Sequence, residues 1–446
     1  MKKTAIFLLI TLVITASSFA QTVNKKEMKK EVKEAFLHAW NGYKQYAWEY
    51  DALKPLTKQG HNWYKQSLLM TPVDAFDVMM IMGLKKESEE AKKIIFEKLS
   101  FDVDMEVQHF EVSIRILAGL ISAYELDGDK RFLTLAKDLA DRLIVVFNSP
   151  TGMPYRYVNL KTGKTSGPVS NPAEIGTYII EYGVLSHHTG DPKYFETAKK
   201  AMAKLHSLRS AIGLPGQGVN VETGEWTNTE SSISGGIDSY FEYMLKAAIL
   251  FNDKDFRDMW QTSLAAVNRY MADTTASGFW YGRVNMNTGE RTRTIYGALD
   301  AFFAGSLALD GDLKRAAMLQ ESNYKMWMLH GIEPEVLDYS TMEVKYPNYV
   351  LRPENVESAY YLYHYTHDEK YLQMGKEMFD NLQKYCRSEV GFTALENVVT
   401  KERADDMESF FFAETLKYFY LLFDDGQSLD FDKVIFNTEA HPYKRF

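Results

Sequence analysis

Apolar residues recur at helical spacing along most of the chain, and short turns rich in Asp and Gly separate the helical stretches. The turns resemble one another, and their aspartates are Asp129, Asp191, Asp253, Asp312, Asp368 and Asp425. Successive aspartates are roughly 60 residues apart, which suits one long helical hairpin and its loop. The pattern therefore predicts a chain of repeated helical hairpins.

The last repeat distinguishes a closed ring from an open solenoid. An open solenoid ends in a unit with a polar outer face. The segment 407–423, with the sequence MESFFFAETLKYFYLLF, is instead apolar and aromatic on nearly every side. Such a helix is typically buried all round. We therefore predict an all-α fold in which about seven hairpins close into an (α/α)7 toroid, with buried inner helices and amphipathic outer helices such as 198–208.

The beginning of the chain has the pattern of an export signal. Two lysines precede an apolar stretch over 5–14, and small residues follow it. We therefore predict a signal peptide over 1–20 and a single α/α-barrel domain over 21–446, in the periplasm or secreted. The apolar stretch is too short for a membrane anchor, and no later stretch has the roughly 20 apolar residues that a transmembrane helix needs.

The net charge limits the molecules that the chain can bind. The formal net charge is -9, so the phosphates of nucleic acids would be repelled. Neutral molecules and cations are the expected partners, and we expect a monomer.

Cys386 is the one cysteine, so no intramolecular disulfide can form. Stability must come from packing, for which 446 residues with 46% hydrophobic content are ample.

Acidic residues in otherwise apolar segments are the first candidates for chemistry, because burying an unpaired carboxylate is costly. Glu111 precedes Arg115 by one helical turn, although a surface ion pair has the same spacing. Asp238 follows a glycine pair at a predicted helix start, where an N-cap is the alternative. Glu354 and Glu357 follow a proline, and acids in a first turn are also favoured by the helix dipole.

Further acids lie in the last repeat and near the C-terminus. Glu408 and Glu414 belong to the aromatic segment, which has little solvated face, whereas Thr438 and Glu439 belong either to a site or to a polar turn. A toroid gathers the ends of its inner helices at one mouth, so these acids can converge.

No zinc-type Cys or His cluster, phosphate loop, nucleophile elbow or dinucleotide fingerprint is present. Paired carboxylates with aromatic neighbours suit glycoside hydrolysis, and oxygen ligands suit calcium.

Several longer motifs resemble glycoside hydrolase family 47, the inverting, calcium-dependent α-1,2-mannosidases. The resemblance runs from residues 35–43 (AFLHAWNGY) nearly to the C-terminus. The most specific motifs are PTGMPY at 150–155, LRPENVES at 351–358, MESFFFAETLKY at 407–418 and FNTEAHP at 436–442. The resemblance implies a seven-hairpin α/α barrel that hydrolyses terminal α-1,2-linked mannose from high-mannose N-glycans or mannans.

The resemblance also assigns roles to single residues. It makes Glu111 the general acid, acting through a water, and Glu354 the base. Asp238 matches a third essential carboxylate, and which of Glu111 and Asp238 donates the proton stays open. Thr438 matches a residue that binds Ca²⁺ through its hydroxyl and carbonyl oxygens. The residues implied in substrate binding are Arg115, Glu174, Arg352, Glu357, Phe410, Glu414 and Glu439. Of these, Glu357, Glu414 and Glu439 match acids that also hold the waters of the ion.

The sequence departs from the family at Gly236, where some members have an Arg that helps to choose the glycan branch. The surrounding residues are closer to the ER degradation-enhancing α-mannosidase-like branch. This leaves an alternative function, a mannose-glycan-binding protein of the same fold with weak or partner-dependent catalysis. Another toroidal sugar enzyme, such as a lyase or epimerase, would usually need a catalytic His or Tyr, so the acids favour hydrolysis.

Overall fold

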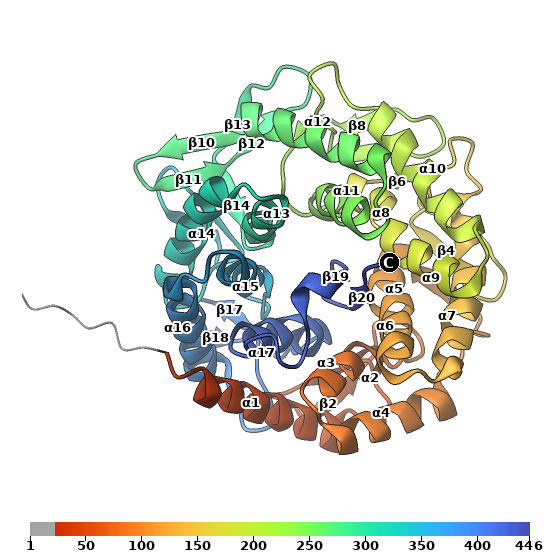
Figure 1. Ribbon diagram of the computed structural model, residues 1–446, viewed down its shortest axis with the longest axis vertical. Helices are drawn as coiled ribbons and strands as arrows, with labels where there is room; N and C mark the ends of the chain where they lie inside the picture. The colour runs from red at the N-terminus through yellow and green to blue at the C-terminus, as the bar shows by residue number, and fades with distance from the viewer. Residues whose placement is uncertain (1–22) are drawn as a thin grey trace, which may run out of the picture.

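The chain forms a ring of two concentric layers of helices (Figure 1). The computed structural model describes residues 23–446, so the predicted signal peptide over 1–20 lies outside the described residues. In the described part, the outer layer consists of α1 (Lys25–Tyr46), α4 (Lys85–Lys98), α7 (Lys130–Leu143), α10 (Lys193–Ser207), α12 (Lys254–Tyr270), α14 (Leu313–Met328) and α16 (Glu369–Cys386). The predicted Asp-containing turns precede most of these helices.

The inner layer is made of shorter helices, several of them in two pieces. They are α2 (Met70–Asp74), α3 (Phe76–Ile81), α5 (His109–Val112), α6 (Ala118–Asp127), α8 (Pro172–Gly176), α9 (Ile179–Thr189), α11 (Asp238–Leu250), α13 (Phe302–Asp310), α15 (Glu354–Thr366) and α17 (Lys417–Leu422). Two π-helical turns, η1 (Ser113–Leu117) and η4 (Phe411–Leu416), continue this layer. Short 3₁₀ turns are η2 (Ile144–Phe147), η3 (Leu299–Ala301) and η5 (Phe431–Lys433).

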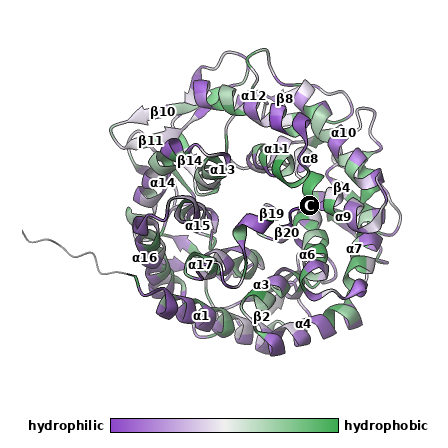
Figure 2. Cartoon of the chain, in the orientation of Figure 1, coloured by the Kyte–Doolittle hydropathy of each residue, from purple (hydrophilic) through white to green (hydrophobic). Residues whose placement is uncertain are grey.

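The sequence explains why each helix belongs to its layer. Asp side chains cap the outer helices by accepting from first-turn backbone N–H groups, as Asp129, Asp253, Asp312 and Asp368 do. Outer helices alternate between buried and exposed residues, whereas an inner helix such as α11 is buried at nearly every position. Figure 2 shows the resulting contrast between polar outer helices such as α1 and apolar inner ones such as α6. The predicted patterning is confirmed.

The ring closes between the two ends of the chain. The first helix, α1, packs against the last inner helix, α17. Lys25 pairs with Asp425 and Lys29 with Asp424, across the junction. The seventh hairpin is therefore composite, because its inner helix comes from the C-terminal part and its outer helix from the N-terminal part. The prediction of an all-α ring of about seven hairpins is confirmed.

Short antiparallel hairpins connect outer helices to the following inner ones. Three-stranded sheets are β3-β4-β5 (Glu106–Gln108, Tyr157–Asn159, Thr165–Ser166), β6-β7-β8 (Val169–Ser170, Gly218–Asn220, Trp226–Asn228), β9-β12-β13 (Glu230–Ser231, Arg283–Asn285, Arg291–Arg293) and β14-β15-β16 (Ile295–Gly297, Val336–Asp338, Glu343–Tyr346). Two-stranded ones are β1-β2 (Ala52–Lys54, Gln59–His61), β10-β11 (Ala272–Thr275, Gly278–Tyr281) and β17-β18 (Leu395–Asn397, Glu402–Arg403). The Gly- and Thr-rich stretches 162–168 and 221–226 lie in such hairpins.

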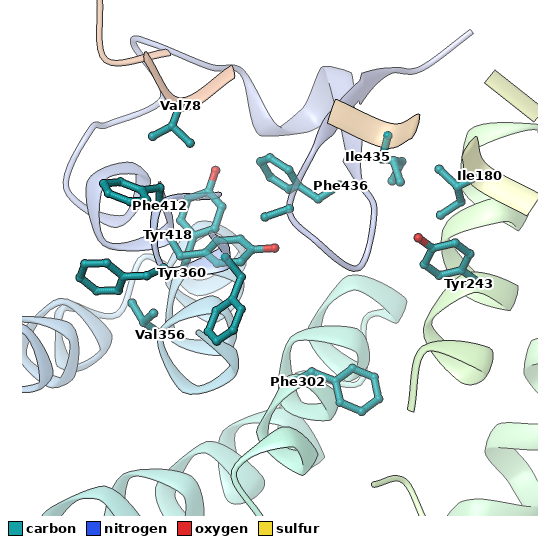
Figure 3. Packing of buried hydrophobic residues seen from close by; sticks show 14 of the residues in the cluster. Val78, Ile180, Tyr243, Phe302, Val356, Tyr360, Phe412, Tyr418, Ile435 and Phe436 are labelled. Atoms are coloured by element: carbon teal, nitrogen blue, oxygen red, sulfur yellow. The ribbon is translucent and has the colours of Figure 1, made fainter. Parts of the chain in front are cut away.

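A last hairpin fills the centre of the ring. Strands β19 (Val434–Phe436) and β20 (Pro442–Lys444) pair in antiparallel register and lie inside the inner helices (Figure 1). Ile435 and Phe436 pack among inner-helix side chains that include Tyr243 and Tyr418 (Figure 3). The loop 437–441 between the strands, which contains Thr438, is thereby held within the ring. None of the helices in residues 23–446 has the length and apolar character needed to cross a membrane.

Candidate active site

A cavity of about 260 Å³ opens where several inner helices begin. Its wall includes the predicted residues Glu111, Arg115, Glu174, Asp238, Arg352, Glu354, Phe410, Glu414, Thr438 and Glu439. Of the predicted site residues, Glu357 does not line it. Glu357 is buried one turn beyond Glu354 in α15, where the Tyr418 hydroxyl donates to its Oε1 over 3.2 Å. The convergence expected of a toroid thus occurs, while the individual roles stay predictions.

Glu354 is the first residue of α15 and lines the cavity. Its Oε2 is buried and has no hydrogen-bond partner among the described residues. Burial raises the pKa of Glu354 to about 7, although the nearby Arg352 guanidinium acts in the opposite direction. The Arg352 Nε donates to Oε1 of Glu335 over 2.6 Å, so its charge is already partly balanced. A carboxyl with a pKa near 7 can exchange a proton with water at neutral pH.

Asp238 begins α11 after Gly236, whose backbone has a φ of +87°. The N-cap position belongs to Ile237, and the Asp238 carboxylate lines the cavity and accepts from the N–H of Ser239 over 2.8 Å. Burial raises the pKa of Asp238 to about 7. The N-cap interpretation is therefore replaced by that of an acid at the cavity wall. An Arg in place of Gly236 would need a different backbone there, because L residues rarely adopt this φ.

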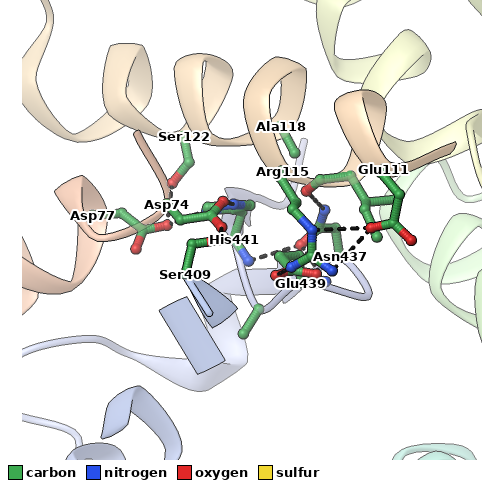
Figure 4. Close-up of polar contacts among 12 residues, drawn as sticks. Asp74, Asp77, Glu111, Arg115, Ala118, Ser122, Ser409, Asn437, Glu439 and His441 are labelled. Carbon is green, nitrogen blue, oxygen red and sulfur yellow. Dashed lines mark hydrogen bonds and ion pairs between the residues drawn. The ribbon is translucent and has the colours of Figure 1, made fainter. Parts of the chain in front are cut away.

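Glu111 and Arg115 form the predicted i,i+4 pair, but at the cavity rather than on an outer surface. Arg115 is 8% exposed, and its Nε donates to Oε2 of Glu111 over 3.0 Å. Its Nη1 pairs with Glu439 from the central loop (Figure 4). The ring centroids of Trp63 and Phe410 lie 5.0 and 5.6 Å from the guanidinium carbon, which is favourable for a cation. Arg115 thus fixes two acids and contacts two rings.

The two acids of the aromatic segment have different places. Glu414 lies in the π-helical turn η4, lines the cavity, and has a pKa raised well above its ordinary value by burial. Glu408 is outside the cavity wall, where its Oε2 accepts from the Trp63 indole N–H over 2.5 Å. Glu408 therefore holds Trp63, which in turn packs near Arg115.

Glu174 faces the cavity with its carboxylate already bonded. Arg156 donates to both carboxylate oxygens over 2.5 and 2.7 Å, and Gln108 donates over 3.1 Å. Asn171 caps α8 by accepting from the backbone N–H of Glu174. Gln108 and Asn171 also line the cavity, although neither was predicted. Both are neutral amides, one at the end of β3 and the other at the N-cap of α8, and nothing in their sequence context separates them from ordinary turn and cap residues.

Thr438 presents the oxygens expected of a calcium ligand. Its N–H donates to the Tyr243 hydroxyl over 3.2 Å, but neither its hydroxyl nor its carbonyl oxygen has a protein hydrogen-bond partner within residues 23–446. It lines the cavity together with Glu414 and Glu439. In the same part of the chain, no three His, Cys, Asp or Glu residues are grouped to bind a metal directly. Two threonine oxygens with nearby carboxylates fit a hard cation that keeps several waters.

A second polar cluster fastens the base of the central loop (Figure 4). Lys417 of α17 lies 2.8 Å from Oδ1 of Asp77 and donates to the carbonyl of Ala440 over 2.5 Å. His441 lies 2.7 Å from Asp77 and 3.3 Å from Asp74. All four charged side chains are essentially inaccessible to water. Although burial acts against ionisation, Lys417 and His441 hold the pKa of Asp77 below its ordinary value. The cluster therefore contains paired, buried charges.

Replacing Lys417 by Met should lower the free energy of unfolding by about 3–5 kcal/mol, because it breaks the buried Lys417–Asp77 pair and leaves Asp77 with His441 alone as a basic partner among the described residues. Denaturant unfolding followed by circular dichroism measures the change. Lys433→Met is the matched control, since Lys433 pairs with Asp430 on the surface with 81% of its side chain exposed. Equal stability of the two variants would show that the buried pair contributes no more than the surface one.

Comparisons with known proteins agree with this geometry. The sequence pattern of glycosyl hydrolase family 47 matches residues 35–445. The endoplasmic reticulum mannosyl-oligosaccharide 1,2-alpha-mannosidase of Mus musculus is 37% identical over 467 residues, covering 97% of this chain and 70% of that protein. The ER degradation-enhancing alpha-mannosidase-like protein 2 of Mus musculus is 36% identical over 450 residues, covering 93% and 77%. The solved structure of an alpha-1,2-mannosidase from Trichoderma reesei has a TM-score of 0.87 at 27% identity, covering 94% of this chain and 99% of that chain. This chain belongs to glycoside hydrolase family 47.

Proposed function

We propose that this chain is an inverting exo-α-1,2-mannosidase that removes terminal α-1,2-linked mannose from high-mannose N-glycans or mannans and depends on calcium. The observation that carries the proposal is the convergence of Glu111, Asp238 and Glu354 on one cavity, with one carboxylate oxygen of Glu354 that has no hydrogen-bond partner in residues 23–446. Glycosidases need one carboxyl to protonate the leaving oxygen and, for inversion, a second to activate water.

The reaction proceeds by a single displacement at the anomeric carbon. Glu354 takes a proton from a water whose oxygen bonds to that carbon, while the glycosidic C–O bond breaks. The leaving oxygen receives a proton from the acid, which is Glu111 through a water or Asp238 directly. The pKa of Asp238, raised to about 7 by burial, keeps part of it protonated near neutral pH. Phe410 offers an apolar ring at the cavity wall for one face of the sugar.

The proposed calcium site uses Thr438 as the direct protein ligand, through its hydroxyl and carbonyl oxygens. Glu414 and Glu439, which share the cavity wall with Thr438, would orient the waters of the ion, as carboxylates outside the first coordination sphere commonly do. When bound, the ion supplies a positive charge that orients sugar hydroxyls. The support from this chain is that Thr438 lines the cavity wall with two oxygens that have no protein partner in the described part of the chain.

The test is hydrolysis, by the purified chain in calcium, of α-1,2-linked mannobiose blocked as its methyl glycoside, so that the released mannose is the one reducing sugar formed. We expect free mannose, with the β anomer appearing first in proton NMR spectra recorded before mutarotation. An α-1,6-linked mannobiose serves as the control and should stay intact. First appearance of the α anomer would overturn the inverting mechanism, and cleavage of both disaccharides at equal rates would overturn the linkage specificity.

The alternative is a mannose-glycan-binding protein with weak or partner-dependent catalysis. The 36% identity to an ER degradation-enhancing alpha-mannosidase-like protein favours it, as does Gly236 at the cavity wall. Calorimetric binding of a high-mannose glycan without release of mannose would support this alternative over the first proposal.

Export to the periplasm or the medium rests on the N-terminal sequence pattern alone. We expect the mature protein to begin at Gln21 and to be a monomer. N-terminal sequencing of protein from fractionated cells and light scattering would check both expectations. An intact N-terminus in a cytoplasmic fraction would contradict the export proposal.

A further inference from the structure

The loop that carries Thr438 is organised around the side chain of Asn437. The Asn437 Nδ2 donates to the carbonyl of Ile114 over 3.0 Å and to Oε1 of Glu181 over 2.9 Å. Its Oδ1 accepts from the N–H groups of Glu439 and His441 over 2.9 and 2.8 Å. Both donors and both acceptor positions of this fully buried amide are therefore used.

Glu181, which accepts from the Asn437 side chain, also connects to the main chain of Thr438 through the hydroxyl of Tyr243. The Tyr243 hydroxyl donates to Oε1 of Glu181 over 2.6 Å and accepts from the N–H of Thr438 over 3.2 Å. Glu181 and Tyr243 are both fully buried, and Tyr243 lies beside Ile435 of the central hairpin (Figure 3). One carboxylate oxygen thus reaches Thr438 through Tyr243 and, separately, through Asn437.

These contacts tie the loop to the helices that present the catalytic acids. Ile114 belongs to η1, next to α5 with Glu111, and Tyr243 belongs to α11, which begins at Asp238. The loop also has a backbone conformation that L residues rarely adopt, since Ala440 has a φ of +60°. Such a conformation persists where surrounding contacts determine it, as the hydrogen bonds at Asn437 do.

We propose that Glu181 and Tyr243 are positioning residues that hold the Thr438 main chain so that its hydroxyl and carbonyl oxygens both face the calcium site. The inference rests on the proposed calcium dependence and goes beyond it, because neither side chain lines the cavity. Two oxygens of one residue can bind one ion only if its backbone is fixed. Groups that orient metal ligands typically contribute about 10–100-fold to metal affinity.

The experiment measures calcium affinity by isothermal titration of the metal-free, full-length mature chain. Tyr243→Phe removes the acceptor for the Thr438 N–H, and we expect its calcium dissociation constant to rise about 10–100-fold. Tyr182→Phe is the matched control, because Tyr182 is equally buried and its hydroxyl lies 3.1 Å from Nε2 of His109, away from the loop. Its calcium affinity should equal that of the wild type.

A second pair of variants separates positioning from general stability. Glu181→Gln keeps an oxygen that accepts from Tyr243 and Asn437, so it should bind calcium nearly as tightly as the wild type. Glu181→Met removes the acceptor and should lose affinity as Tyr243→Phe does. In Tyr243→Phe and Glu181→Met we expect saturating calcium to restore kcat, because neither Tyr243 nor Glu181 lines the cavity that would hold the sugar. If Glu181→Met does not fold, Tyr243→Phe decides the question.

The calcium titrations have three possible outcomes, each with a different consequence for the proposal. Weaker binding by Tyr243→Phe with unchanged binding by Tyr182→Phe supports the proposal. Wild-type affinity in Tyr243→Phe, or equal losses in Tyr243→Phe and Tyr182→Phe, overturns the positioning role and leaves the proposed calcium dependence intact. No calcium binding by the wild type overturns the proposed calcium dependence and the positioning role together.

Discussion

Replacing Glu354 by Gln is expected to lower kcat/KM for α-1,2-linked mannobiose by about 10²–10⁴-fold, the usual contribution of a general base. Glutamine has nearly the same shape, but its amide cannot take a proton from the attacking water. The fold should persist, because Oε2 of Glu354 has no hydrogen-bond partner among the described residues that an amide nitrogen would displace. Initial rates of mannose release, with a melting curve of the variant, measure both effects.

Glu111→Gln should lose activity to a similar extent if Glu111 relays the proton to the leaving oxygen. Glu408→Gln is the matched control for both variants. Burial raises the pKa of Glu408 to about 7, as for Glu354, but Glu408 does not line the cavity and its oxygen only accepts from Trp63. Its activity should stay close to the wild-type value. Near-normal turnover by Glu354→Gln would remove Glu354 from the proposed mechanism.

The ring was predictable from sequence because it depends on repetition. Evenly spaced aspartates mark the starts of outer helices, and four of them cap such helices through their side chains. The composite seventh hairpin was not predicted, since α1 carries no turn that identifies α17 as its partner. The π-helical turns were not predicted either. Each departs from α-helical hydrogen bonding only locally, so the hydrophobic period hardly changes.

The candidate site was predictable mainly through motifs. From the residues alone, Asp238 was as compatible with an N-cap as with a catalytic acid, and only packing places its carboxylate in the cavity. Glu181 lies in the apolar helix α9 but was not among the predicted site residues. Its partners Tyr243 and Asn437 are 62 and 256 residues away, and such contacts leave no local pattern. Glu357 is the opposite case to Glu181. Its motif predicted a site residue, but its side chain does not line the cavity.

Removing calcium is expected to abolish mannose release and to lower the melting temperature together. Thr438 lies in the loop of the β19–β20 hairpin, which fills the centre of the ring, so an ion bound there would fasten this segment to the inner helices. A ligand that binds only the folded state stabilises it by RT ln(1 + [L]/Kd), about 2.7 kcal/mol at a hundredfold excess over Kd. Scanning calorimetry and rate measurements after exhaustive chelation, with and without added calcium, would record both effects.

Magnesium is the matched control for this experiment. It demands near-ideal octahedral geometry at about 2.0–2.1 Å and gives up water reluctantly, whereas calcium accepts irregular oxygen sites at about 2.3–2.6 Å. Calcium should therefore restore activity and melting temperature, and magnesium at equal concentration should not. A Thr438→Val variant removes one of the two unpartnered oxygens while keeping the shape of the side chain, so it should need more calcium for the same recovery. Full activity of the metal-free chain would make Thr438 an ordinary turn residue.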